Sequence, residues 1–119
     1  MPRENAVVDQ ILGYLNGLKG CVAEKTQGTA LSSGKADING CINGKALRIE
    51  VKTLDHGNVP SKKQYVNLMR WNAAGAVCIV AYTVEDVKAI VMASGEIDSY
   101  YKKDYGNGMI AERVNGWRC

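Results

Sequence analysis

Apolar side chains recur at helical spacing near the start of the chain, and this pattern predicts an amphipathic helix over residues 4–18. Gly17 and Gly20 are residues that commonly end helices, and residues 21–27 then predict a first strand. The small residues at 28–34 indicate a loop. The apolar stripe of the helix consists of Val7, Val8, Ile11, Leu12, Leu15 and Leu18.

The dipeptide Asn-Gly at 43–44 stands between alternating apolar residues, which is the strongest short-range signal for a two-residue β-hairpin turn. It predicts a hairpin over residues 36–53. Counting back from this turn pairs Ile38 with Ile49, so one face of the hairpin is expected to be apolar.

The same register pairs Ala36 with Val51 on the apolar face. On the other face it sets Asp37 directly opposite Glu50, with their Cβ atoms about 5 Å apart. Like charges at that separation are destabilising, so a cation must lie between the carboxylates or one of them must hold a proton. Lys52 points to the same face, about 7 Å along the strand from Glu50. The hairpin therefore predicts a metal-binding pair of acids with a lysine beside it.

Two further helices and one strand are expected downstream of the hairpin. The segment Ser-Lys-Lys-Gln at 61–64 fits a capping box and predicts a helix to about Ala74. Residues 77–82 form a short continuous apolar run, which is typical of a strand buried on both faces. Thr83 can cap another helix that ends near Ala93.

The order helix, three strands, helix, strand, helix predicts an α/β layered fold with a small mixed sheet flanked by helices. At 119 residues the chain is expected to form one domain, residues 1–119. Its core would span about residues 4–93, followed by a C-terminal extension over 94–119. For this extension the pattern leaves irregular structure and extra short elements equally open.

The cysteine and histidine content restricts the kind of metal site. The four cysteines have no C-x-x-C spacing and His56 is the single histidine, which argues against a zinc site and makes His56 a poor candidate for catalysis. Free cysteines fit a reducing cytoplasm. Any metal is therefore expected to be a hard cation held by oxygen, such as Mg²⁺ or Mn²⁺. With no apolar run of about 20 residues and no signal-peptide pattern, we expect a cytoplasmic location without a membrane partner.

The formal net charge of +3 proves no partner by itself, but the distribution of the basic residues is suggestive. A solvated basic surface would explain them equally well on charge alone. Beside a metal-binding pair of acids, a polyanionic substrate becomes the better interpretation. The basic residues in or just after the acidic motif are Lys35, Arg48, Lys52, Lys62, Lys63 and Arg70.

Each candidate residue also has a structural interpretation. Asp37 and Glu50 can be a polar pair on a solvated sheet face, although their opposed register favours metal binding. Val51 would add only its backbone carbonyl, as a further oxygen ligand. Lys52 can be an exposed strand lysine, or it can orient or deprotonate an attacking water and neutralise charge developing on a phosphate.

Glu4 and Gln64 stay undecided on pattern alone. Glu4 aligns with the buried stripe of the first helix, so it can be a third carboxylate for the metal or a favourable acid in a first helical turn. Gln64 is explained by the capping box, with projection towards the site as the alternative. The aromatic residues of the tail are expected in the core or an interface rather than as base-stacking platforms, and they are Tyr100, Tyr101, Tyr105 and Trp117.

An aspartate thirteen residues before Glu-Val-Lys resembles the PD-(D/E)xK nuclease signature, and the order of elements is similar to the restriction-endonuclease-like αβββαβ core. Over about residues 4–90 the chain resembles the VRR-NUC family, particularly its small stand-alone virus-type nucleases. The strings that carry the resemblance are GKADI at 34–38, RIEVKT at 48–53, SKKQ at 61–64 and GAV at 75–77.

The resemblance assigns a role to each candidate. It implies that Asp37 and Glu50 hold the metal together with Glu4 from the first helix. It also implies that Lys52 is the catalytic lysine and that Gln64 belongs to the active-site motif. Ala36 replaces the proline that usually precedes the aspartate, which affects the local backbone rather than the chemistry.

The activity implied is Mg²⁺-dependent DNA endonuclease chemistry, with Mn²⁺ able to substitute, in the host cytoplasm if the chain is viral. Stand-alone members are associated with branched DNA such as four-way (Holliday) junctions. Because one small domain offers one site and symmetric resolution needs two cuts, a two-fold homodimer is expected. Its interface would be the aromatic tail or the helix of residues 83–93. The alternatives are a nuclease acting on flaps, ends or duplex DNA, and a DNA-binding module without hydrolysis.

Overall fold

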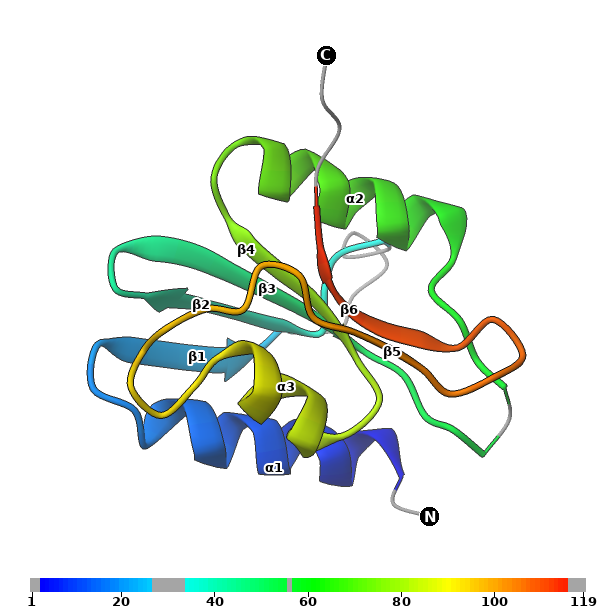
Figure 1. The fold of residues 1–119 in the computed structure, drawn as a ribbon, viewed down its shortest axis with the longest axis horizontal. Coiled ribbons are helices and arrows are strands. Elements are labelled where there is room, and N and C mark those ends of the chain that lie inside the picture. The colour runs from blue at the N-terminus through cyan, green and yellow to red at the C-terminus, as the bar shows by residue number, and fades with distance from the viewer. Residues whose placement is uncertain (1–2, 27–33, 56, 116–119) are drawn as a thin grey trace.

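The protein is described here from a computed structural model that covers residues 3–26, 34–55 and 57–115. His56 and Trp117, and almost all of the loop expected at 28–34, lie outside the described residues. The described chain forms a mixed sheet with helices on both faces (Figure 1). No helix within it is long and apolar enough to cross a membrane.

The elements follow the predicted order and then continue beyond it. Helices α1 and α2 and strand β4 begin and end within about two residues of their predicted limits. Helix α3 is shorter than predicted, because Val91 has an extended backbone and pairs with Ile97. The elements are α1 (Glu4–Asn16), β1 (Cys21–Lys25), β2 (Ile38–Ile42), β3 (Lys45–Val51), α2 (Lys62–Ala73), β4 (Val77–Ala81), α3 (Val84–Ile90), β5 (Lys102–Asp104) and β6 (Ile110–Val114).

The sheet has six strands in the order β1-β2-β3-β4-β6-β5. Only β3 and β4 run parallel, and every other neighbouring pair is antiparallel, which confirms a mixed sheet in an α/β fold. The tail resolves into short strands rather than irregular structure, because β6 pairs with β4 and β5 pairs with β6. The C-terminal segment thus extends the sheet that carries the predicted site.

The Asn-Gly turn sets the register of the hairpin as predicted. Ile38 pairs with Ile49, and Asn43 at the turn has a positive φ of 48°. The predictions that Ala36 pairs with Val51 and that Asp37 pairs with Glu50 are wrong, because the β2–β3 ladder ends at Ile38 and the chain bends at position 37. Ala36 instead packs against the α2 side of the sheet, whereas Val51 lies in the cluster on the other side.

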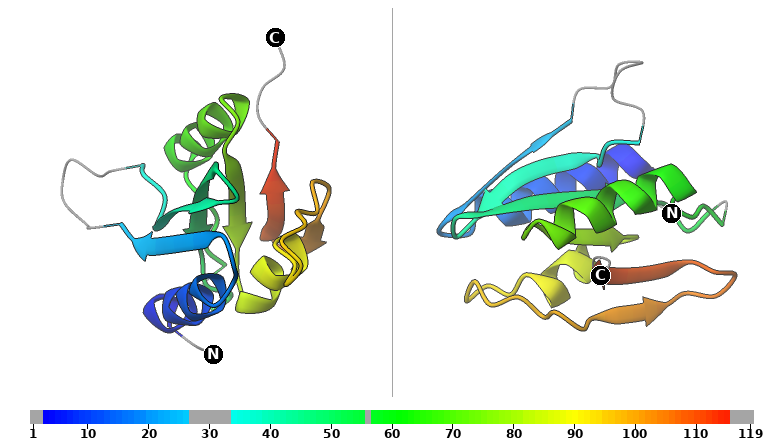
Figure 2. Two further views of the ribbon diagram at one scale, coloured as in Figure 1. Left: turned by 90° about the vertical axis from the view of Figure 1, so that its left-hand side faces the viewer. Right: turned by 90° about the horizontal axis from the view of Figure 1, so that it is seen from above.

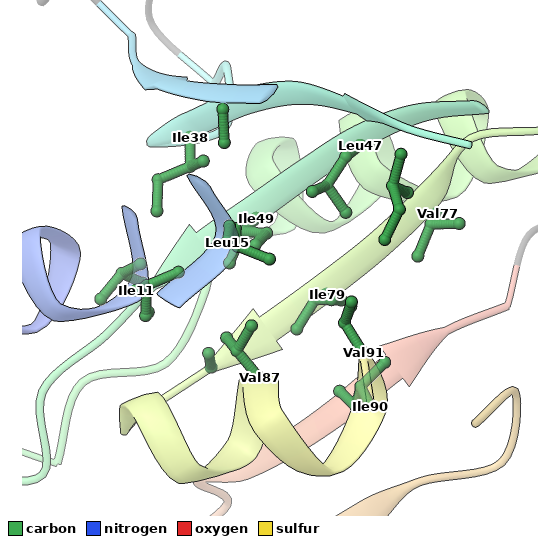
Figure 3. Close-up of a cluster of buried hydrophobic side chains, with 14 of the residues drawn as sticks. Ile11, Leu15, Ile38, Leu47, Ile49, Val77, Ile79, Val87, Ile90 and Val91 are labelled. Atoms are coloured by element: carbon green, nitrogen blue, oxygen red, sulfur yellow. The ribbon is translucent and has the colours of Figure 1, made fainter. Parts of the chain in front are cut away.

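Apolar residues fill both faces of the sheet. Helices α1 and α3 lie next to each other over one face, and α2 covers the other (Figure 2). Strand β4 is buried at all five positions, as its apolar run predicted, because it lies between these two layers. The cluster under α1 and α3 includes Ile11, Leu15, Ile38, Leu47, Ile49, Val77, Ile79, Val87, Ile90 and Val91 (Figure 3).

Candidate functional site

The end of β3 that follows Ile49 brings together the side chains that the sequence singled out. Glu50 is the second-to-last residue of β3 and lies on the α2 side of the sheet, and Lys52 comes directly after the strand. Asp37 lies in the segment that leads into β2, and Gln64 is in the first turn of α2. Glu4 is the first residue of α1, and its charge interacts with those of Asp37 and Lys52.

Asp37 is held by the backbone of β3 rather than by a continued ladder. Its Oδ2 accepts a hydrogen bond from the backbone N–H of Val51 at 2.8 Å. Its own carbonyl accepts one from the Thr26 N–H at 2.8 Å. The side chain therefore replaces the backbone pairing expected at this position, which explains why the strand bends and Ala36 turns to the other side.

Glu50 is almost completely buried, with 1% of its surface exposed. Its Oε1 accepts a hydrogen bond from Gln64 Nε2 at 3.1 Å and lies 3.9 Å from Lys52 Nζ. Its Oε2 is buried and has no hydrogen-bond partner within the described parts of the chain. A buried acceptor without a partner costs about 1–3 kcal/mol, so this oxygen calls for a proton or a cation.

The environment of Glu50 strongly favours its neutral form in the absence of metal. Burial, the negative charge of Asp37 and a side-chain hydrogen bond that protonated Glu50 can make to Asp37 raise the pKa of Glu50 to about 9, and Lys52 only partly opposes them. This agrees with the expectation that two adjacent carboxylates need either a cation or a proton. A divalent cation between them would stabilise the ionised form of both carboxylates and so offset the causes of the raised pKa.

Gln64 has both of the roles that the sequence left open. Its Oε1 accepts a hydrogen bond from the backbone N–H of Ser61 at 2.8 Å, and the Ser61 hydroxyl accepts one from the Gln64 N–H at 3.1 Å. This completes the capping box of α2. The amide nitrogen remains available to donate to Glu50, so the cap fixes the orientation of that donor.

Glu4 joins the site less closely than the other residues. It is exposed rather than aligned with the buried stripe of α1. Partial desolvation and the charge of Asp37 raise its pKa, while Lys52 and Lys25 act in the opposite direction. Over residues 3–26, 34–55 and 57–115, no three His, Cys, Asp or Glu side chains are grouped closely enough to hold a metal ion.

The residues present are nevertheless suited to Mg²⁺. This ion keeps several waters and commonly binds through one or two carboxylates, so Asp37 and Glu50 can serve without a closed protein shell. The unpartnered Oε2 of Glu50 provides an oxygen for such an ion. The arrangement can hold a hard cation next to an ammonium group, which is a suitable environment for an anionic phosphate.

Sequence reasoning missed one arrangement on the same face of β3. The guanidinium carbon of Arg48 lies 3.9 Å from the ring centroid of Trp71 on α2. Period-two alternation could have placed Arg48 on the face of Glu50, since the two are separated by one residue. Nothing in the pattern could have placed Trp71 above it, because that depends on how α2 packs.

A second arrangement that the pattern did not reveal surrounds Asp86. The cap that the sequence predicts at Thr83 is present, as a capping box between Thr83 and Asp86. The fully buried carboxylate also accepts hydrogen bonds from the hydroxyls of Tyr101 and Tyr105, at 2.9 and 2.8 Å. These contacts are structural, and they place Tyr101 and Tyr105 partly buried against the core, whereas Tyr100 is 88% exposed and lies outside it.

Comparison with protein-family models and with curated protein sequences gave no match for this chain.

Proposed function

We propose that this chain is a metal-dependent endonuclease that hydrolyses DNA phosphodiester bonds. The observation that carries the proposal is the buried carboxylate of Glu50, which has an unpartnered oxygen and lies beside Asp37 and Lys52. A purely structural acid would be expected to have all of its oxygens hydrogen-bonded. The resemblance to the VRR-NUC family and its restriction-endonuclease-like core supports the same activity.

In this proposal Asp37, Glu50 and the Val51 carbonyl hold Mg²⁺, or Mn²⁺ in its place, with Glu4 adding a carboxylate at the rim. When bound, the cation supplies polarisation of a phosphoryl oxygen and acidification of water. Lys52 orients the attacking water and neutralises the negative charge that develops on the phosphate.

We propose branched DNA, including four-way junctions, as the substrate, and this choice rests on the family resemblance. Flaps, duplex ends and defined duplex sequences are the competing substrates. A labelled panel of four-way junction, flap and linear duplex, incubated with Mg²⁺ or Mn²⁺, separates them. Preferential cutting of the junction supports the proposal, and equal cutting of all substrates contradicts the junction preference.

We also propose that two copies act together, because one chain offers one site and symmetric resolution of a junction needs two cuts. Val87 and Ile90 of helix α3 are buried in the hydrophobic core of the same chain. The tail is therefore the better candidate for the dimer interface. Tyr100 in that tail is 88% exposed. A monomeric sedimentation profile, both with and without junction DNA, would contradict the dimer.

Alanine at Asp37 tests the site directly. Asp37→Ala is expected to abolish Mg²⁺-dependent cleavage while DNA binding in Ca²⁺ persists. Glu96→Ala removes an exposed acid far along the chain and is the matched control. Unchanged cleavage by Asp37→Ala would show that the site is wrongly assigned. DNA binding by the wild type without cleavage on any substrate would favour a non-catalytic binding module.

A further inference from the structure

A small basic cavity lies beside the site, between the segment before β2, strand β3 and helix α2. Its volume is about 180 Å³, and the described residues that line it include lysine, arginine and asparagine side chains and no carboxylate. A broader depression of about 490 Å³ shares Asn67 with it and is also free of acidic lining residues. The smaller cavity, called the basic cavity below, is lined by Lys35, Ala36, Asn39, Arg48, Asn67 and Trp71.

Arg48 is held in a defined position in this cavity. Its guanidinium lies over the Trp71 ring, and its Nη1 donates a hydrogen bond to the carbonyl of Leu47 at 2.9 Å. Within the described residues Arg48 forms no ion pair with a carboxylate. A planar guanidinium fixed on an aromatic ring, with donors left for an anion, is well suited to binding a phosphate.

The position of Arg48 relative to Glu50 gives this feature its meaning. The two residues alternate along β3, so they share the α2 face and are about 6.7 Å apart along the strand. Each is contacted by a residue of α2, Trp71 and Gln64 respectively. One repeat of a β-strand is similar to the distance between successive phosphates of one DNA strand. A DNA strand that runs along β3 with its scissile phosphate beside Glu50 would place the neighbouring phosphate at the basic cavity.

We propose that Arg48, supported by Trp71, binds the DNA backbone phosphate next to the one that is cleaved. The inference rests on the proposed function, because the carboxylates of Asp37 and Glu50 define the position of the scissile phosphate. Asn39, opposite Arg48 in the ladder, and Asn67 line the same cavity, and the Asn39 amide also donates a hydrogen bond to the Thr26 hydroxyl at 2.7 Å. Since phosphate contacts position DNA without reading its sequence, the contact would fix the register of cleavage.

The test uses DNA that carries a single uncharged methylphosphonate at successive positions around the cut site. Binding is measured in Ca²⁺ so that affinity is separated from cleavage. The wild type is expected to lose about tenfold or more in affinity when the phosphate adjacent to the cut site is neutralised. The variant Arg48→Gln is expected to bind unmodified DNA more weakly than the wild type by a similar factor. Neutralising the phosphate adjacent to the cut site should not weaken its binding further.

Two matched variants separate this contact from general electrostatics. Lys19→Gln removes an exposed cation beyond the far end of α1, and its affinity and salt dependence are expected to be unchanged. Arg48→Gln is expected to reduce the slope of log affinity against log salt by about one. Trp71→Ala, which removes the ring beneath the Arg48 guanidinium, is expected to reproduce part of the loss of affinity.

The outcomes distinguish the two proposals. If neutralising the adjacent phosphate weakens DNA binding by Arg48→Gln as much as it weakens binding by the wild type, Arg48 does not contact that phosphate. The nuclease proposal would still stand. A different result is that the wild type binds DNA without cleaving it, and that one methylphosphonate position weakens wild-type binding but not binding by Arg48→Gln. In that case the nuclease proposal fails and Arg48 remains a phosphate ligand. Circular dichroism and thermal unfolding establish that each variant is folded.

Discussion

Glu50 lies in an environment that the folded protein can tolerate only with a proton or a cation. Its side chain is buried beside Asp37, and Lys52 at 3.9 Å compensates this only in part. Gln64 donates a hydrogen bond to one oxygen and leaves the other without a partner. The described residues therefore leave a buried carboxylate with a raised pKa and one oxygen without a hydrogen-bond partner. Groups with strongly shifted pKa values are common where binding or catalysis takes place.

The raised pKa of Glu50 makes the stability of the metal-free protein depend on pH. The pKa is about 9 in the folded protein and 4.5 in the reference state, so between these values the folded form holds one more proton. Its stabilising contribution is complete below about pH 4.5 and is lost as pH rises towards 9. The free energy of unfolding should fall by up to about 1.4 kcal/mol per pH unit.

Thermal unfolding in EDTA between pH 6 and 9 measures this dependence. The variant Glu50→Gln carries no titratable proton at this position, so its melting temperature should vary less with pH. Glu96→Gln, at an exposed acid, should keep the wild-type slope. Equal slopes in the wild type and Glu50→Gln would contradict the prediction.

Lys52 is expected to act in the chemical step. Replacement by methionine retains much of the side-chain volume but removes the ammonium, so Lys52→Met should lower the cleavage rate by about 10²–10⁴-fold. Affinity for DNA in Ca²⁺ should change much less. Rates under single-turnover conditions, compared with Lys19→Met, separate the two effects. Loss of binding as large as the loss of rate would indicate a mainly electrostatic role.

At the scale of elements, the first turn of α2 links helix formation to the site. The capping box uses the carbonyl oxygen of the Gln64 side chain, and the amide nitrogen of the same side chain reaches Glu50. The first turn of α2 therefore positions the Gln64 amide nitrogen to donate to the buried Glu50 carboxylate, because the cap uses only the oxygen of that side chain. Arg48 and Trp71 connect the same helix to β3 further along.

Two substitutions in this turn should separate the cap from the site. Ser61→Ala removes the cap and should lower the free energy of unfolding by about 1 kcal/mol, with a small effect on cleavage. Gln64→Glu preserves the capping box but replaces the donor to Glu50 with a third carboxylate, so cleavage should fall while the helix remains. Chemical denaturation and single-turnover cleavage measure the two effects. Equal loss of cleavage in both variants would contradict the separation.

At the scale of the whole molecule, the C-terminal segment belongs to the sheet that carries the site. Strand β6 pairs with β4, the parallel neighbour of β3 (Figure 1). The buried carboxylate of Asp86 connects this segment to α3, since it accepts bonds from two backbone N–H groups and two tyrosine hydroxyls. The network holds the outer part of the sheet against the helix layer.

Asp86→Ala is therefore expected to destabilise the protein by about 3 kcal/mol or more, because several buried donors lose their acceptor at once. Tyr105→Phe removes one donor and should cost about 1 kcal/mol. Asp98→Ala replaces an acid that accepts a hydrogen bond from the Tyr100 N–H, and should destabilise the protein less than Asp86→Ala. Urea unfolding measures all three. A loss for Asp86→Ala no larger than that for Tyr105→Phe would contradict a cooperative network.

Short stretches of sequence account for the local elements and for several of the side chains that meet at the end of β3. The Asn-Gly turn set the hairpin register, because a two-residue turn admits one pairing, and period-two alternation placed Glu50 and Lys52 on one face. The Ser-Lys-Lys-Gln segment determined the start of α2 through short-range hydrogen bonds. These features depend on neighbours within a few residues along the chain.

Only the tertiary structure decided how far the site is buried and what surrounds it. The burial of Glu50 depends on α2 packing over β3, and the bend at Asp37 depends on a bond to the Val51 N–H that replaces ladder pairing. The position of the tail strands and the contact between Arg48 and Trp71 likewise join residues distant in sequence. Such contacts depend on how whole elements pack against one another, and no local pattern of apolar and polar residues encodes that packing.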